Sequence, residues 1–331
     1  MMLSLRLIVP PDRTVGVTRQ LAEDERATNL VVLPGGGVRP AGDLVQCEVA
    51  REAVSDVLGW LRSQGIYDDG SVVISEVVAA PSKNARATEL AAPGAPDDAV
   101  VWDAVMDNAY GEVRGSWSFY AFLTLATAIA AVAVVTDSSI LVVGAMVVGP
   151  EFGVVAALAV GLSAGRAALA GHSALLLLKG FSFAIAVTIV LALLARAAGW
   201  IELADVTGPR PLTGFIWRPD KWSAVVAVLA GCAGVLSQTA GRSSALVGVF
   251  ISVTTVPAAG DIALSLALGA SDQLLGSAAQ LGINLLGMTT AGVLTLLAQR
   301  SLWKLTRGRP GKPRSRHKGG SAGRGAGTPG R

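Results

Sequence analysis

Two acidic residues follow prolines inside long apolar stretches, and these residues are the best placed to do chemistry. Glu151 comes directly after Gly149 and Pro150, and Asp261 lies four residues after Pro257 in a second stretch. A carboxylate inside a membrane segment is unfavourable unless it faces a cavity, binds a cation or carries a proton. The two positions therefore predict a binding site for an unknown small solute or ion.

The two stretches resemble each other around their prolines. Each begins with a Ser-Ser pair, at 138–139 and at 243–244, runs apolar to the proline, and resumes as a stretch of small residues. Unwound backbone is tolerated at membrane depth only where it lines a cavity or is buried in protein. Matching interruptions in two halves of a chain mark the substrate site of many transporters. We therefore expect the site at Gly149–Glu151 and Val256–Pro257.

Each candidate also has a purely structural interpretation. Glu151 would stabilise the start of the second half-helix, where free N–H groups and the helix dipole favour negative charge. Asp261 would be either the second acid of a two-acid site or an acid near the outer surface. Lys179, roughly 9 Å into the third apolar run, would extend to the cytoplasmic interface or pair with Glu151. Asn284 would bind unwound carbonyl groups or substrate, or pack between helices.

Six apolar runs are long enough to cross a membrane as helices. The chain is 52% hydrophobic and 15% charged, which is typical of an integral membrane protein. The runs lie at about 119–136, 139–164, 173–198, 223–240, 243–268 and 276–299. The repeat begins at the second run and again at the fifth, so each unit has three spans and the second is inverted. The sequence predicts an α-helical membrane protein with six spans, two inverted repeats and broken helices.

A small soluble α+β domain precedes these runs. Alternating strands at 3–9, 29–33, 44–49 and 70–78, with helices at about 10–25 and 51–64, give the order βαββαβ of a ferredoxin-like domain. We expect this domain at 1–80, with a turn-rich connection at 34–42. A linker at 81–96 and an amphipathic helix at 97–117 make up the segment 81–118, followed by the transmembrane domain at 119–300 and a disordered basic tail at 301–331.

Charge is distributed unevenly and predicts orientation. Residues 1–117 hold 17 acids and 10 bases, a net charge of −7, whereas residues 301–331 hold nine bases and no acid. The connections around Arg166 and Arg242 share one side with the tail, and the 199–222 loop lies on the other. By the positive-inside rule, both termini are cytoplasmic. We expect the tail to bind anionic lipid headgroups and expect no nucleic-acid partner.

Motifs of other chemistry are absent from the sequence. Cys47 and Cys232 have no second cysteine or histidine at ligand spacing, and the two histidines form no HExxH motif. No serine has the Gly-x-Ser-x-Gly setting of a hydrolase. We therefore expect no metal, no cofactor and no enzyme; an enzyme acting on lipid is a third, less supported interpretation because no nucleophile and base are visible.

The first interrupted stretch resembles a known family. Gly144-Ala-Met-Val-Val-Gly-Pro150, with Gly161 and Leu162 after it, resembles the recurring signature of the hydrophobic proteins known as the domain of unknown function 389 family. The stretch 248–257, followed by Asn284, is similar to the family's second block. The resemblance covers about 110–300.

This resemblance implies a multi-pass protein of the prokaryotic inner membrane, in a family often interpreted as transporters and without an established substrate. Glu151 and Ala258 stand where the family pattern has an apolar residue and a second proline. Chemistry inferred for other members therefore does not transfer directly to these positions.

Two classes of function follow from these observations. The first is a solute transporter, coupled to protons or another cation, with its site at the paired breaks. The second is a non-transporting membrane sensor or scaffold, in which the cytoplasmic domain binds a ligand and the spans form an anchor. A wet cavity between the repeats favours the first, and dry packing favours the second. Open strand edges and small-residue helix faces predict a homo-oligomer.

Overall fold

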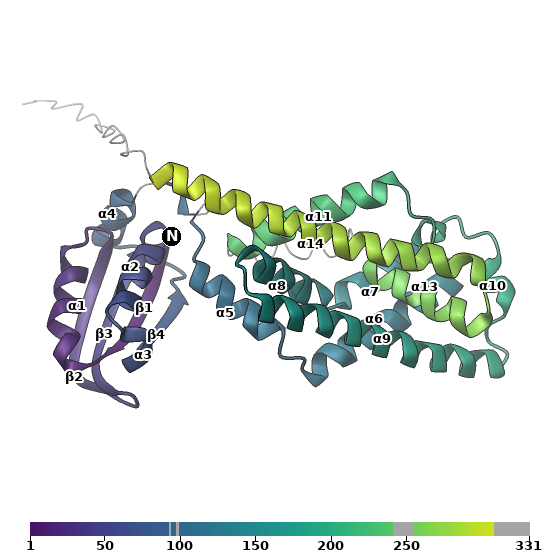
Figure 1. The fold of residues 1–331 in the computed structure, drawn as a ribbon, viewed down its shortest axis with the longest axis horizontal. Coiled ribbons are helices and arrows are strands. Elements are labelled where there is room, and N and C mark those ends of the chain that lie inside the picture. The colour runs from purple at the N-terminus through teal and green to yellow at the C-terminus, as the bar shows by residue number, and fades with distance from the viewer. Residues whose placement is uncertain (93, 97–98, 241–253, 308–331) are drawn as a thin grey trace, which may run out of the picture.

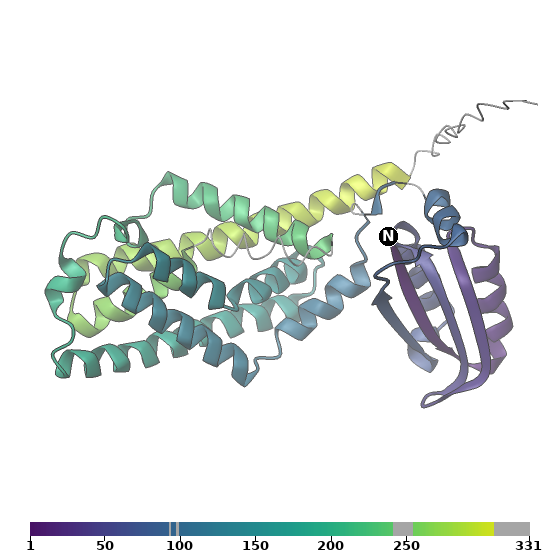
Figure 2. The same ribbon diagram turned by 180° about the vertical axis from the view of Figure 1, so that it is seen from behind.

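A four-stranded sheet with its helices lies at one end of the molecule, and a bundle of long apolar helices makes up the rest (Figures 1 and 2). The structure is a computed structural model, and it describes residues 1–92, 94–96, 99–240 and 254–307. Within these ranges the chain is mostly helical. The small antiparallel sheet is confined to the N-terminal part.

The N-terminal part contains the four predicted strands and the two predicted helices in the predicted order. The sheet is antiparallel, with strand order β2-β3-β1-β4. Alternation along β1 places Leu3, Leu5, Leu7 and Val9 in the core, each 3% exposed or less. The elements are β1 (Met2–Val9), α1 (Pro11–Glu23), β2 (Ala27–Val38), β3 (Ala41–Ala50), α2 (Arg51–Ser63), α3 (Ile66–Asp69) and β4 (Ser71–Glu76).

Two boundaries differ from the sequence prediction. The turn expected at 34–42 is shorter, because β2 continues through its glycines and Gly37 pairs with Gly42 on β3. The absence of side chains allows this close pairing, since a Cβ on Gly37 would lie 3.1 Å from the Gly42 carbonyl oxygen. The expected linker at 81–96 contains a helix, α4 (Lys83–Ala91), which begins where the Ser82 side chain accepts a hydrogen bond from the Ala85 N–H at 3.0 Å.

An amphipathic helix, α5 (Trp102–Glu112), connects the two parts, and it is shorter than the predicted 97–117. Its buried residues Val105 and Ala109 face the bundle, where α5 packs along α8. On its other side, Asp103 forms an ion pair with Arg62 of α2. The helix therefore lies between the sheet and the bundle and contacts both.

The bundle contains several helices that are apolar and long enough to cross a membrane. Among the described residues, four helices are long and apolar enough to cross a membrane on their own, and a fifth span is formed if the bent pair α7 and α8 counts as one. The helices are α6 (Trp117–Val135), α7 (Ser139–Val148), α8 (Glu151–Ser163), α9 (Ala167–Ala197), α11 (Lys221–Thr239), α13 (Thr255–Leu268) and α14 (Ser271–Arg307). The first part of the fifth predicted span, at 243–253, lies outside the described residues, so five of the six predicted spans have a described counterpart of full length.

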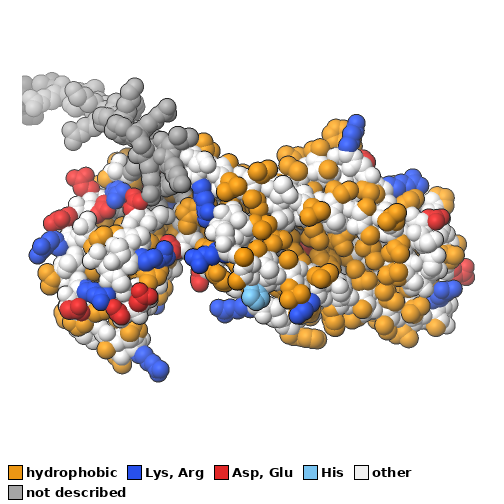
Figure 3. Space-filling view, in the orientation of Figure 1, with side chains coloured by type: hydrophobic (Ala, Val, Ile, Leu, Met, Phe, Trp, Pro, Cys, Tyr) orange, Lys and Arg blue, Asp and Glu red, His pale blue; other side chains and the backbone are white. Residues whose placement is uncertain are grey.

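The surface of the bundle is apolar around its middle. Figure 3 shows hydrophobic side chains covering this region, with charged side chains mainly toward the two ends. Leu178, Leu194, Leu229 and Leu286 are each more than 60% exposed. Such a surface is unfavourable in water and favourable in lipid, so the protein is a membrane protein.

The half-helices α8 and α13 run in opposite directions along α14. The end of α8 lies near the C-terminal end of α14, where Arg300 donates a hydrogen bond to the Ser163 carbonyl at 2.8 Å. The end of α13 lies beside the start of α14, since only Gly269 and Ala270 separate them. Both half-helices also pack against α9.

Candidate functional site

The predicted interruption at Gly149 and Pro150 is present and bends the span by 54° between α7 and α8. Gly149 ends α7 in an extended conformation, and Pro150 precedes the first residue of α8, Glu151. Proline lacks the N–H that would continue the hydrogen-bonded ladder, so the helix breaks at this point. Pro150 also fits at the start of α8, where no intrahelical partner is required.

The first predicted break meets the start of α13 at Gly149; residues 243–253, which would precede the second predicted break, lie outside the described ranges. A Cβ on Gly149 would lie 2.8 Å from Cγ2 of Val256, and closer still to the Glu151 carboxylate. Because only glycine leaves this space free, the first break can approach the second half-helix, α13, near its first turn. Val256 and Pro257 are both buried in that turn. The structure therefore brings Gly149, Pro150, Glu151 and Val256 together, with Pro257 directly after them.

Glu151 lies buried at this junction, with 6% of its surface exposed. The Thr255 side chain, at the start of α13, adjoins its carboxyl group, while Oε2 has no hydrogen-bond partner among the described residues. The first turns of α8 and α13 both adjoin this carboxyl group. Their free N–H groups and dipoles favour negative charge at this point.

A second polar cluster surrounds Thr254, directly before α13. Gln280 and Asn284, both buried on α14, donate hydrogen bonds to the Thr254 hydroxyl at 2.9 and 3.1 Å. Asn284 therefore contacts a side chain directly before α13, whereas its candidate role with unwound carbonyl groups or substrate stays a prediction. Sequence reasoning missed Gln280, although it lies four residues before Asn284 and thus on the same face of one helix.

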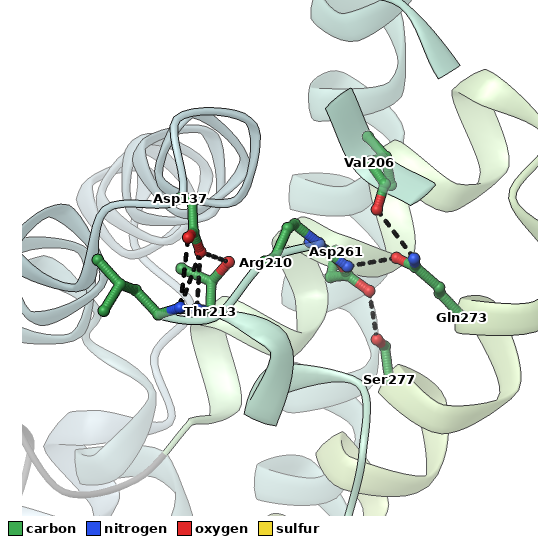
Figure 4. Close-up of polar contacts among 8 residues, drawn as sticks. Asp137, Val206, Arg210, Thr213, Asp261, Gln273 and Ser277 are labelled. Carbon is green, nitrogen blue, oxygen red and sulfur yellow. Dashed lines mark hydrogen bonds and ion pairs between the residues drawn. The ribbon is translucent and has the colours of Figure 1, made fainter. Parts of the chain in front are cut away.

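Asp261 does not form a two-acid site with Glu151. It is completely buried, and its Oδ1 pairs with Arg210 Nη1 at 2.9 Å while its Oδ2 accepts a hydrogen bond from Ser277 at 2.5 Å (Figure 4). The alternative interpretation, an acid near the outer surface, does not describe Asp261 fully either. Its side chain is covered by the 199–222 loop, which supplies Arg210. The sequence analysis did not identify Arg210. The only indication in the sequence is that a carboxylate buried in an apolar helix requires a counter-ion somewhere in the chain.

Lys179 does not pair with Glu151. Its side chain is exposed, and the ion pairs of the described chain include neither residue. Lys179 precedes Gly180, which packs against Phe119, two residues after the exposed Trp117. A lysine at the level of an exposed tryptophan is typical of a membrane boundary, which favours the interpretation of Lys179 as an interfacial residue.

The 199–222 loop is anchored at a second point. Asp137, between α6 and α7, accepts hydrogen bonds at 2.8 Å from both the N–H and the hydroxyl of Thr213, and a weaker one from the Leu212 N–H (Figure 4). The loop contains α10 (Leu203–Thr207) and the short 3-10 helix η2 (Gly214–Ile216). A cavity of about 850 Å³ lies between this loop and the junction of α13 with α14.

Comparison with known families gives a match within the bundle. Residues 146–290 match the model of the family described as Domain of unknown function (DUF389). The resemblance that the sequence predicted is therefore confirmed over residues 146–290, which lie in the helical bundle. No curated protein and no solved structure gives a significant match to the chain.

Proposed function

We propose that the protein transports a small solute, coupled to a proton or another cation that binds at Glu151. The observation that carries this proposal is the buried Glu151 carboxyl group, with one unpartnered oxygen, where the two half-helices begin. Burial of a carboxylate costs free energy, because the charge loses its contact with water. A bound proton or cation offsets this cost. Convergent half-helix ends are a recurring device for holding ions in transporters.

The packing of the bundle supports six spans in two inverted repeats. One unit is α6, the bent pair α7 and α8, and α9; the other is α11, the span that ends with α13, and α14. In each unit the half-helix packs against the third helix of its own unit and against that of the other unit. The opposite directions of α8 and α13 along α14 are those of an inverted pair. The strand order likewise supports a ferredoxin-like N-terminal domain.

The proposal includes a location in the inner membrane of a prokaryotic cell, with both termini in the cytoplasm. We expect a cysteine replacing the exposed Glu202 to react with a membrane-impermeant maleimide added to intact cells. A cysteine replacing the exposed Asp68 should react only after the cells are permeabilised. The reverse pattern would show that the positive-inside assignment is wrong.

The main test concerns Glu151→Gln, which keeps the size of the side chain but removes its charge and its exchangeable proton. Purified protein in proteoliposomes with an entrapped pH-sensitive dye would be challenged with gradients of organic acids, amino acids and inorganic ions. We expect at least one of these solutes to drive proton movement in the wild type and none to do so in Glu151→Gln.

The matched control is Asp107→Asn, which neutralises an exposed acid on α5 and should leave proton movement unchanged. Wild-type protein that moves none of these solutes, or Glu151→Gln with wild-type coupled flux, would count against the proposal.

One contact favours the alternative of a sensor, or of a transporter regulated by its N-terminal domain. Arg51, at the start of α2, is buried and donates hydrogen bonds to the Ala99 carbonyl at 3.1 Å and to the Thr239 carbonyl at 3.0 Å. Thr239 is the last residue of α11 and also accepts a hydrogen bond from Gln299 of α14. A ligand that shifts α2 would thus act directly on the end of a span; ligand binding without any solute flux would favour a sensor.

A further inference from the structure

We propose that the ion pair between Arg210 and Asp261 is the gate that closes the outer side of the transport path. This inference rests on the proposed function, and it assigns a role to a cluster that the Glu151 site does not use. The gate is closed in the structure described, and it would have to open once in each transport cycle.

The ion pair connects a loop to two helices, and such a contact can break without unfolding either helix. Arg210 belongs to the loop, whereas Asp261 lies on α13 and the second acceptor of the guanidinium, Gln273, lies on α14 (Figure 4). Gln273 in turn donates to the Val206 carbonyl of α10 at 2.9 Å. A single loop side chain therefore bridges α13 and α14 of the second unit, and its withdrawal would free Asp261 and Gln273 from the loop side chain while Ser277 still donates to Asp261.

The chemistry of the pair also suits a contact that opens. The side chains of Arg210 and Asp261 are 3% and 0% exposed, and Arg210 Nε has no partner within the described structure. Apolar side chains would hold a permanently closed contact at least as well as this buried pair. Charged groups are solvated by water when they separate, which stabilises the open state. Apolar groups in the same place would expose apolar surface to water on opening.

The pair lies between a cavity and the proposed ion site. On the solvent side, the cavity of about 850 Å³ is lined by Arg210 and Gln273 together with Trp217 and Arg218, and its volume is that of a site for a small solute. On the inner side, Asp261 lies six residues along α13 from Thr255, a distance of roughly 9 Å. Ala258, which is fully buried, lies on α13 between the two points.

Labelling at position 258 tests the gate without knowledge of the substrate. Ala258→Cys would be placed in a chain whose Cys47 and Cys232 are replaced by serine, and reacted in intact cells with a membrane-impermeant maleimide. We expect slow labelling with Arg210 present and labelling faster by about tenfold or more in Arg210→Gln, a change of about 1.4 kcal/mol in the opening equilibrium. Asp261→Asn should have the same effect, and the exchanged pair Arg210→Asp with Asp261→Arg should slow labelling again.

Two controls separate opening of the gate from general loss of structure. Asp272→Asn neutralises another acid that lines the same cavity and should not change labelling. A cysteine at the buried Ala159 of α8 should stay unreactive in every variant, because it lies in the other half-helix. Equal labelling of position 258 in Arg210→Gln and wild type would overturn the gate, whatever the result for Glu151. Faster labelling at 258 alone supports the gate, even if the flux test of Glu151 fails.

Discussion

Replacement of Arg210 by methionine is expected to destabilise the folded protein by about 3–5 kcal/mol, because it leaves the Asp261 carboxylate buried without its counter-ion. Asp261 is completely buried, and Ser277 alone does not neutralise its charge. Methionine retains the apolar length of the side chain, so the loss reflects charge more than volume. Denaturant titration of the purified protein in mild detergent, followed by tryptophan fluorescence, measures the change in the free energy of unfolding.

A double-mutant cycle isolates the pair itself. The double variant Arg210→Met with Asp261→Asn carries no buried charge, so we expect it to be more stable than Arg210→Met alone. Asp272→Asn, in the same region but outside the network, should change stability by less than about 0.5 kcal/mol. A loss below about 1 kcal/mol in Arg210→Met, or strictly additive effects in the cycle, would show that the ion pair contributes little.

The second large effect is expected from Gly231→Leu at the crossing of α11 and α14. A Cβ on Gly231 would lie 2.8 Å from the Met288 Cα and 2.9 Å from the Ala291 Cβ, and closer still to the Met288 carbonyl oxygen. Backbone atoms cannot move aside as a flexible side chain does, so the helices must separate. We expect a loss of about 3 kcal/mol, at the upper end of the range for overpacking.

Gly282→Leu is the matched control for this variant. Gly282 lies in the middle of α14, and a Cβ there would meet no atom within 4 Å. Both substitutions improve intrinsic helix propensity by about the same amount, so their difference reports the crossing alone. The same titration in detergent measures both variants. Similar stabilities for Gly231→Leu and Gly282→Leu would mean that α11 and α14 do not pack as closely as the structure indicates.

The sequence by itself determined the features that depend on neighbouring residues. Alternation in β1, five of the six apolar runs and the break at Gly149–Pro150 follow from local backbone chemistry, and among the described residues each lies about where it was predicted. Glu151 was identified in the same way, because a carboxylate directly after a proline in an apolar run is visible without any partner. The helix α4 was missed, since a short run of alanine and charged residues carries little apolar periodicity.

Only the tertiary structure decided which side chains pair across the bundle. Arg210 and Asp261 lie 51 residues apart, and Arg210 belongs to a loop without the periodicity that would orient its side chain. The contact of Gly149 with Val256 likewise depends on how two half-helices cross, and the exposure of Lys179 depends on which face of α9 meets lipid. These contacts depend on long-range packing. A buried charge pairs with the counter-ion that the fold places near it, and no local sequence pattern specifies which residue that is.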